Sequence, residues 1–281
     1  MVELKGAERI VRAGSGEAAV EVAGLTKTYR SRAGAVEAVR GVDLLVEGGE
    51  MFGFLGPNGA GKSTMVRMLT TLLSITAGTA RVAGLDVARE PDAVRQRIGV
   101  ALQDAGLDAR QTGRELLVLQ GRLFDLSARD AAERAQELLE LVELTDAADR
   151  RIKSYSGGMK RRLDLASALV HRPDVLFLDE PTTGLDPASR VTVWDEVRRI
   201  NERGTTVFLT TQYLEEADQL CDRLAIIDGG LIVREGTPAR LKADLRQRLG
   251  REVTLDDVFL DATGRTRTHV AGEVQEVSTH D

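Results

Sequence analysis

The sequence of 281 residues predicts an α/β fold in which helices cover a largely parallel sheet. Short apolar runs that suit buried strands recur at residues 51–55, 175–178, 206–210 and 224–227. Helix-like patterns separate the last three of these runs, and such alternation is typical of parallel strands. The first run leads directly into a glycine-rich loop and then into a periodic helix over residues 64–73.

Composition limits the possible functions. A net charge of −6 argues against a large surface for binding DNA or RNA, so no nucleic-acid partner is expected. The sole cysteine, Cys221, rules out an intramolecular disulfide and fits a reducing cytosol. No apolar run reaches the ~18 residues that a membrane-spanning helix needs. A protein of this kind would reach a membrane only through a partner.

The chain divides by composition into several parts. Residues 1–18 are expected to form a flexible leader. Strand patterns follow at residues 20–29 and 35–46, where apolar and polar residues alternate. Residues from about 108 to 170 are rich in Leu, Ala, Glu and Arg at helical spacing, which predicts a helical subdomain inserted into the α/β core. Residues 238–281 form a C-terminal extension that ends in a polar tail.

A phosphate-binding loop follows the first apolar run. Its residues fit the pattern G-x-x-x-x-G-K-[ST] and are Gly56, Pro57, Asn58, Gly59, Ala60, Gly61, Lys62 and Ser63, with Thr64 next in the helix. Glycines let backbone N–H groups surround phosphate oxygens, and the helix directs its positive dipole end toward them. Lys62 is expected to reach the β- and γ-phosphates, and the Ser63 hydroxyl to ligate Mg²⁺. The loop therefore predicts a nucleotide site with catalytic and cofactor-binding roles for Lys62.

Two acids end the second apolar run. Asp179 and Glu180 follow residues 175–178, at the carboxyl end of a predicted parallel strand, where α/β sheets place their ligands. Asp179 is expected to hold Mg²⁺, and Glu180 to polarise the attacking water as a general base. Apolar strands that end in acids are common, so this interpretation depends on the phosphate loop.

The segment from Ser154 to Arg161 reads Ser-Tyr-Ser-Gly-Gly-Met-Lys-Arg. It resembles the signature motif of ABC-type ATPases, which is usually Leu-Ser-Gly-Gly-Gln. Tyr155 and Met159 depart from that form, whereas Ser156, Gly157 and Gly158 match it. A hydroxyl and glycine N–H groups at the start of a helix, which is expected over residues 159–169, also form a second anion site, although the same serine would serve as an ordinary helix cap.

This resemblance covers about residues 19–237 and implies a P-loop NTPase core of RecA-like type, with an antiparallel β subdomain and an inserted α-helical subdomain. It also implies roles for three further residues. Tyr29 would stack on the adenine. Gln103 would bind Mg²⁺, sense the attacking water and touch the membrane partner. Asp186, within Gly-Leu-Asp-Pro, would lie in the loop that bridges the two ATP sites of a dimer.

Gln212 is the departure with the greatest consequence. ABC-type ATPases usually have a histidine at this point, where it contacts the γ-phosphate. An amide donates a hydrogen bond but carries no positive charge and relays no proton. The change therefore puts the rate of hydrolysis in question, but not the binding of ATP.

The implied function is ATP hydrolysis that powers a membrane exporter of drugs, antibiotics or other hydrophobic compounds. The resemblance implies ATP and Mg²⁺ as cofactors, a homodimer in which Ser156–Gly158 of one subunit closes over the nucleotide of the other, and a transmembrane permease on a separate chain. The protein would lie on the cytoplasmic face of the membrane and touch it only through that permease. Residues 254–260 resemble a C-terminal motif of daunorubicin-resistance ATPases, although an amphipathic segment that packs on the core would read similarly.

Several alternatives remain open at this point. A soluble ABC ATPase of translation or DNA repair would usually have two ATPase units or a long coiled-coil insertion. A nucleotide sensor without turnover would fit Gln212 but not Lys62 and Glu180. A metabolic kinase would need no Ser-Gly-Gly, and import is disfavoured only by the motif at residues 254–260.

Overall fold

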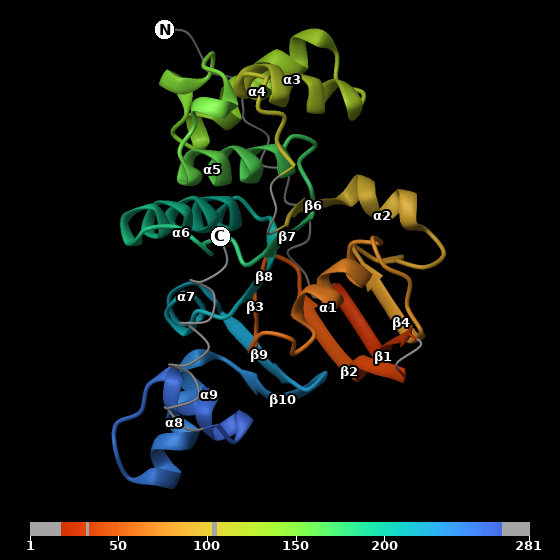
Figure 1. Ribbon diagram of the computed structural model, residues 1–281, viewed down its shortest axis with the longest axis vertical. Helices are drawn as coiled ribbons and strands as arrows, with labels where there is room; N and C mark the ends of the chain where they lie inside the picture. Colours follow the sequence, from red (N-terminus) through yellow and green to blue (C-terminus); the bar gives the residue numbers. More distant parts are fainter. Residues whose placement is uncertain (1–17, 32–33, 103–105, 266–281) are drawn as a thin grey trace, which may run out of the picture.

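The computed structural model describes residues 18–31, 34–102 and 106–265. These residues form an α/β core of two sheets, with helices between and around them (Figure 1). The α/β class expected from the sequence, with a largely parallel core sheet and a separate antiparallel sheet, is confirmed. Within the described ranges, no helix has both the length and the apolar character needed to cross a membrane.

The larger sheet has six strands in the order β10-β9-β3-β8-β7-β6. Its strands are β3 (Met51–Leu55), β6 (Ile98–Ala101), β7 (Val175–Asp179), β8 (Thr206–Thr211), β9 (Arg223–Asp228) and β10 (Leu231–Gly236). All neighbours pair in parallel except β9 and β10, which form an antiparallel hairpin. Every residue of β3, β7 and β8 is buried, which explains why these strands read as short apolar runs.

The smaller sheet is antiparallel and has the order β2-β1-β4-β5. Its strands are β1 (Ala18–Ser31), β2 (Gly34–Glu47), β4 (Ala77–Val82) and β5 (Leu85–Asp86). Helix α1 (Lys62–Leu69) lies between the two sheets, where Met65, Val66, Met68 and Leu69 share one hydrophobic cluster with residues of both. Ala18 belongs to β1 and not to the predicted leader, whose other residues lie outside the described ranges.

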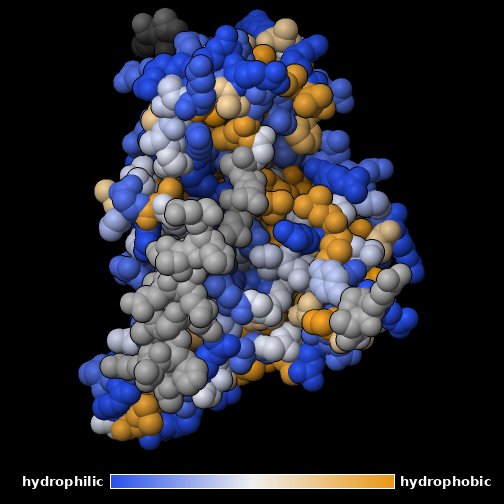
Figure 2. All heavy atoms as spheres, viewed as in Figure 1, coloured by the Kyte–Doolittle hydropathy of each residue, from blue (hydrophilic) through white to orange (hydrophobic). Residues whose placement is uncertain are grey.

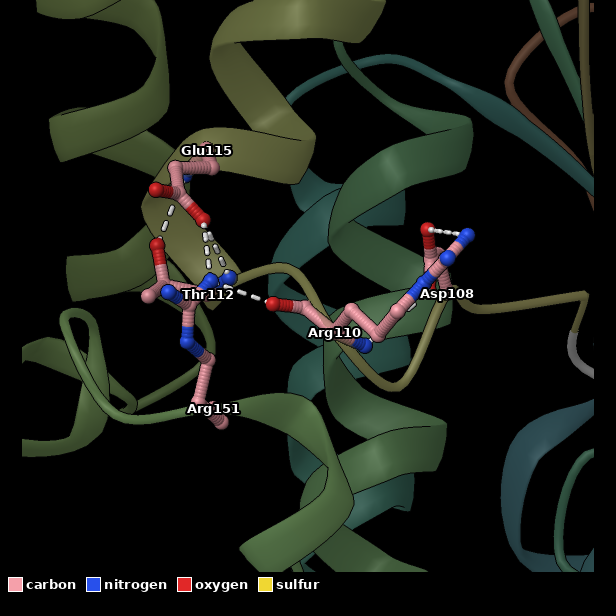
Figure 3. A network of polar contacts seen from close by, with 5 residues as sticks. All are labelled: Asp108, Arg110, Thr112, Glu115 and Arg151. Carbon is pink, nitrogen blue, oxygen red and sulfur yellow. Dashed lines mark hydrogen bonds and ion pairs between the residues drawn. The ribbon is translucent and has the colours of Figure 1, made fainter.

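Helices fill the chain between β6 and β7 in the part that the structure describes. They are α3 (Gly113–Leu123), α4 (Ala128–Leu141) and α5 (Gly157–Ala168), with two short 3₁₀ turns between α4 and α5. They lie together at one end of the molecule (Figure 1). Thr112 and Glu115 form a capping box that starts α3, and Arg151 donates to Glu115 and to the carbonyl of Arg110 (Figure 3).

The remaining helices surround the core. They are α2 (Pro91–Arg97), α6 (Pro187–Glu202), α7 (Leu214–Leu220), α8 (Pro238–Leu249) and α9 (Leu255–Thr263). Helix α9 buries Leu255, Val258 and Phe259 in the main hydrophobic cluster. Residues 254–260 therefore pack on the core as an amphipathic segment, as one of the two interpretations predicts.

Two predicted helix boundaries are wrong. The helix after the phosphate loop was expected over residues 64–73 but runs from Lys62 to Leu69. It ends there because the Thr70 hydroxyl bonds to the carbonyl of Val66 and Thr71 has a φ of 63°. The signature helix was expected from Met159 but begins at Gly157, because Ser156 is its cap.

Candidate functional site

The phosphate loop lies between the end of β3 and the start of α1, as the sequence predicts. Gly61 has a φ of 110°, and a Cβ atom there would stand 2.4 Å from the carbonyl oxygen of Ala38. Gly56 is as confined, since its Cβ would meet the carbonyl oxygen of Ile227 at 2.4 Å. These two positions accept only glycine, because a side chain would displace backbone. Packing against neighbouring backbone therefore fixes the shape of the loop.

Lys62 is the buried cation of the loop, with a residue exposure of 4%. Its Nζ atom donates to the carbonyl oxygens of Gly56 at 2.8 Å and Pro57 at 3.2 Å. The same atom lies 3.3 Å from Oε1 of Glu180, whose side chain is 9% exposed. An ammonium group held inside a glycine-rich loop, beside a carboxylate, is placed to neutralise phosphate charge.

Hydroxyl and carboxylate oxygens gather where α1, β7 and β8 meet. The Ser63 hydroxyl donates to Oδ1 of Asp179 at 3.3 Å, and the Thr210 hydroxyl donates to the same oxygen. Asp179 is buried and is the last residue of β7. A serine hydroxyl and an aspartate carboxylate are hard oxygen ligands of the kind that Mg²⁺ takes, so these side chains fit a magnesium site.

Glu180 has an unusual backbone conformation with a φ of 49°. Its N–H group donates to the carbonyl oxygen of Thr210 at 3.0 Å, which ties the residue to β8. Its carboxylate accepts a hydrogen bond from the Thr183 hydroxyl at 3.2 Å and faces Lys62. A left-handed glutamate that is held by three contacts is typical of a strained functional position.

Sequence reasoning missed Arg161, which supports these acids from α5. Its Nε atom donates to the carbonyl of Pro181 at 2.8 Å, and its Nη2 atom to the carbonyl of Asp179 at 3.2 Å. Burial lowers the pKa of this guanidinium, and the nearby carboxylates Asp164 and Asp179 oppose that shift. Arg161 therefore ties the signature helix to the acidic end of β7. In the sequence, Arg161 is one of three consecutive basic residues that follow Gly157 and Gly158, and nothing in that pattern distinguishes its role.

A buried carboxylic acid supports the segment that follows Glu180. Glu216 of α7 accepts hydrogen bonds from the Thr182 hydroxyl at 2.8 Å and from Nε1 of Trp194 at 3.0 Å. Burial raises the pKa of Glu216, while hydrogen bonds to it act in the opposite direction. This contact joins α6 and α7 beneath the loop that carries Asp186.

The signature segment, Ser156–Gly158, stands at the start of α5. The Ser156 hydroxyl accepts the N–H of Met159 at 3.2 Å, so it is a helix cap, and both Ser156 and Gly157 are exposed. Tyr155, a departure from the usual motif, is buried and donates its hydroxyl to the carbonyl of Ala147 at 2.6 Å. That departure is therefore accommodated by the hydrophobic core of the helical part and leaves the anion-binding atoms exposed.

The other predicted residues lie on separate elements. Asp186 caps α6 and accepts the Ser189 N–H at 3.0 Å, and the hydrogen bonds from Ser189 lower the pKa of its carboxyl. Gln212 directly follows β8 and is half-buried. Tyr29 on β1 is 41% exposed. Gln103 lies outside the described residues.

The structure thus brings together Lys62, Ser63, Asp179 and Glu180, but leaves Ser156–Gly158 and Asp186 at the starts of two other helices, α5 and α6. A glycine-rich loop between a parallel strand and a helix, with acids at the end of another strand of the same sheet, defines a P-loop nucleotide-binding protein.

Comparison with known proteins identifies the family within this class. The profile of the ABC transporter family matches residues 39–183. The chain is 57% identical over 227 residues to the daunorubicin/doxorubicin resistance ATP-binding protein DrrA of Streptomyces peucetius, across 81% of this chain and 68% of DrrA. It is 44% identical over 223 residues to the Nod factor export ATP-binding protein I of Rhizobium meliloti, across 79% of this chain and 65% of that protein.

Solved structures agree with this assignment. The ATP-binding cassette MJ0796, in a dimeric post-hydrolysis state bound to ADP and Pi, has a TM-score of 0.71 and 27% identity, across 78% of this chain and 98% of that one. An ATP-binding subunit of an ABC transporter has a TM-score of 0.74 and 26% identity, across 86% and 98%. The chain belongs to the ABC transporter family. It is an ATP-hydrolysing subunit of that family and uses ATP with Mg²⁺.

Proposed function

We propose that this chain powers the export of a drug, an antibiotic or another hydrophobic compound through a permease on a separate chain. The observation that carries the ATP-hydrolysing part of this proposal is the contact of 3.3 Å between Lys62 in the phosphate loop and Glu180, which follows β7. It places a cation for the phosphates beside a carboxylate for the attacking water. The names of the relatives, which concern resistance to daunorubicin and doxorubicin or Nod factor export, support the direction and the class of substrate.

The described residues supply the parts of a phosphoryl-transfer site. Lys62 and the backbone N–H groups of residues 58–63 would hold the phosphates, with the adenine against Tyr29. Ser63 and Asp179 would hold Mg²⁺, with Gln103 as the further ligand proposed from the sequence, and the ion supplies charge neutralisation when bound. Glu180 would orient the water, since its carboxylate is fixed by Thr183 and Lys62.

A second copy of the chain would complete each site. Ser156 and Gly157 expose a hydroxyl and backbone N–H groups at the start of a helix, where an anion is favoured. We infer that they close over the γ-phosphate bound to the phosphate loop of the partner, with Asp186 beside the same interface. The dimeric state of MJ0796 supports a homodimer of this kind. Hydrolysis would remove the bridging charge, and the pair would open.

The permease would contact the face on which the helical part meets the core, through the loop around Gln103. Leu72, Leu119 and Leu123 are large apolar side chains that are 57%, 44% and 67% exposed. Hydrophobic side chains also gather on the visible face between α3 and β4 (Figure 2). This surface would hold the chain at the cytoplasmic face of the membrane without lipid contact of its own. The export relatives do not favour the soluble ATPase or sensor alternatives.

The experiment measures ATP hydrolysis by the purified chain, with inverted membrane vesicles that contain a candidate permease and with matched vesicles that lack it. We expect ATP turnover that depends on Mg²⁺ and is faster with vesicles that contain the permease than with vesicles that lack it. Lys62→Ala should abolish it, because the loop then has no cation for the phosphates. Equal turnover with both kinds of vesicle would contradict export by that pair, and unchanged turnover in the Lys62 variant would contradict the site.

A further inference from the structure

Arg190, near the start of α6, has two contacts that join segments from different parts of the site. Its guanidinium carbon lies 4.6 Å from the centre of the Tyr213 ring, within the range of a cation–π interaction. Its Nε atom donates to the carbonyl oxygen of Leu185 at 3.2 Å. Both Arg190 and Tyr213 are half-buried. The arginine therefore connects the turn before Asp186 with the residue after Gln212.

On one side, this connection reaches the signature segment. A Cβ atom on Gly158 would lie 3.0 Å from the Ser189 hydroxyl oxygen and 3.3 Å from its Cβ atom. A Cβ atom on Gly157 would lie 4.0 Å from the Leu185 side chain. Ser189 is also the residue whose N–H group donates to the Asp186 carboxylate that caps α6. The glycines that would receive the partner's nucleotide thus lie against the turn that Arg190 holds.

On the other side, the connection reaches the end of β8. The N–H of Tyr213 donates to the Thr211 hydroxyl at 2.9 Å, which forms a tight turn around Gln212. β8 also carries Thr210, which bonds to Asp179 and to Glu180. The Tyr213 ring therefore lies on a short turn that directly follows β8, the strand whose Thr210 contacts Asp179 and Glu180.

We propose that Arg190 is a positioning residue that keeps Gln212 of a subunit's own ATP site in register with the signature segment that faces the partner's ATP. The proposal rests on the proposed function, because it requires two nucleotides between two subunits. Gln212 has no charge, so its contribution depends on where its amide stands. A cation over the adjacent ring, bonded at the same time to Leu185, fixes that place relative to Ser189 and Gly158.

The test is a double-variant cycle on Arg190→Leu and Tyr213→Leu, with turnover and ATP binding measured separately. Each single variant should lower kcat about fivefold or more, because Gln212 loses its fixed position. Binding of ATP to the isolated subunit should stay within about twofold, since the phosphate loop is unaffected. The double variant should be no slower than the slower single variant, because both substitutions remove the same contact.

Two further variants separate positioning from general damage. Tyr213→Phe retains the ring and should keep kcat within about twofold of the unmodified chain. Arg198→Leu is the matched control, because Arg198 also lies on α6 and donates to a carbonyl, that of Gln219 in α7, at 3.1 Å. It should leave kcat unchanged. A slow Tyr213→Phe variant, effects that multiply in the double variant, or an unaffected kcat in Arg190→Leu would overturn the inference.

Failure of the inference is distinct from failure of the proposed function. If the unmodified chain hydrolyses ATP and Lys62→Ala does not, the ATP site stands whatever the Arg190 variants do. If the unmodified chain has no turnover with any permease, the proposed function fails and the inference fails with it.

Discussion

At the scale of single residues, the site depends on how side chains are held as much as on which ones are present. Glu180 adopts a φ of 49°, and its N–H group bonds to Thr210 of β8. This left-handed conformation costs about 1–3 kcal/mol and persists because the surrounding contacts determine it. The carboxylate is thereby directed at Lys62 rather than along the strand.

Gln212 offers a direct test at this scale. Gln212→Ala should lower kcat by about tenfold or more, because a hydrogen bond to a phosphate oxygen contributes about 1.5–3 kcal/mol. Gln212→His should keep or raise turnover, since an imidazole also donates to the phosphate. Steady-state hydrolysis with both variants provides the measurement. Full activity of Gln212→Ala would show that this amide does not touch the reacting phosphate.

The sequence predicted the residues of the phosphate loop, Asp179 and Glu180 because their types and order follow directly from phosphate and magnesium chemistry. It did not predict Arg161 or Thr210, which act through backbone carbonyls and one carboxylate oxygen. Such contacts depend on how α5, β7 and β8 approach one another. No local pattern encodes that approach, so only the tertiary structure could reveal these residues.

At the scale of elements, the phosphate loop permits a matched pair of glycine substitutions. Gly59 and Gly61 both have positive φ, at 78° and 110°, but a Cβ atom on Gly59 meets nothing within 4 Å. Gly59→Ala should cost about 1 kcal/mol through backbone conformation alone. Gly61→Ala should cost more, about 3 kcal/mol, because its Cβ would also displace the carbonyl of Ala38. Urea unfolding compares them, and equal losses would contradict the packing described for the loop.

A buried glutamate lies where α5 and α6 meet, and its carboxyl should make the stability of the folded chain depend on pH. Glu196 is fully buried, and burial raises the pKa of its carboxyl to about 8. Arg162 opposes this shift from a distance of 3.9 Å, but burial outweighs it, and its Nη1 atom also donates to the carbonyl of Val142. Because the folded pKa lies above the unfolded value, the folded chain binds the additional proton, and stability falls as pH rises toward and through about 8.

Glu196→Gln should remove this dependence. The variant should gain on the order of 2 kcal/mol relative to the unmodified chain between pH 6 and pH 9, as measured by urea unfolding at the two values. The exposed Glu202 on the same helix provides the control, since Glu202→Gln should leave the comparison unchanged. An identical loss of stability at pH 9 with and without the Glu196 carboxyl would contradict this assignment.

The boundaries of elements were harder to predict than their existence. The apolar runs of β3, β7 and β8 were evident because both faces of these strands are buried. Helix α1 was expected to extend to residue 73, since Leu72 and Leu73 continue the apolar pattern. It ends at Leu69 because the backbone turns at Thr71, a conformation that hydrophobic periodicity does not report.

At the scale of the whole molecule, the proposed function requires one chain to supply two unlike halves of an ATP site. Lys62, Asp179 and Glu180 meet within the core, whereas the signature segment is exposed at the start of α5. In the proposed dimer, a second subunit would bring its signature segment to the phosphate loop. The bound γ-phosphate would then attract both subunits, and hydrolysis would release them.

The most direct test of this claim is the mass of Glu180→Gln in solution, measured by light scattering with ATP and Mg²⁺. Without a carboxylate to orient the water, ATP should persist, and a stable dimer should form that reverts to monomer when nucleotide is removed. Adding Lys62→Ala to this variant should prevent dimer formation. A Glu180→Gln variant that binds ATP with Mg²⁺ yet remains monomeric would contradict an ATP site shared between two subunits.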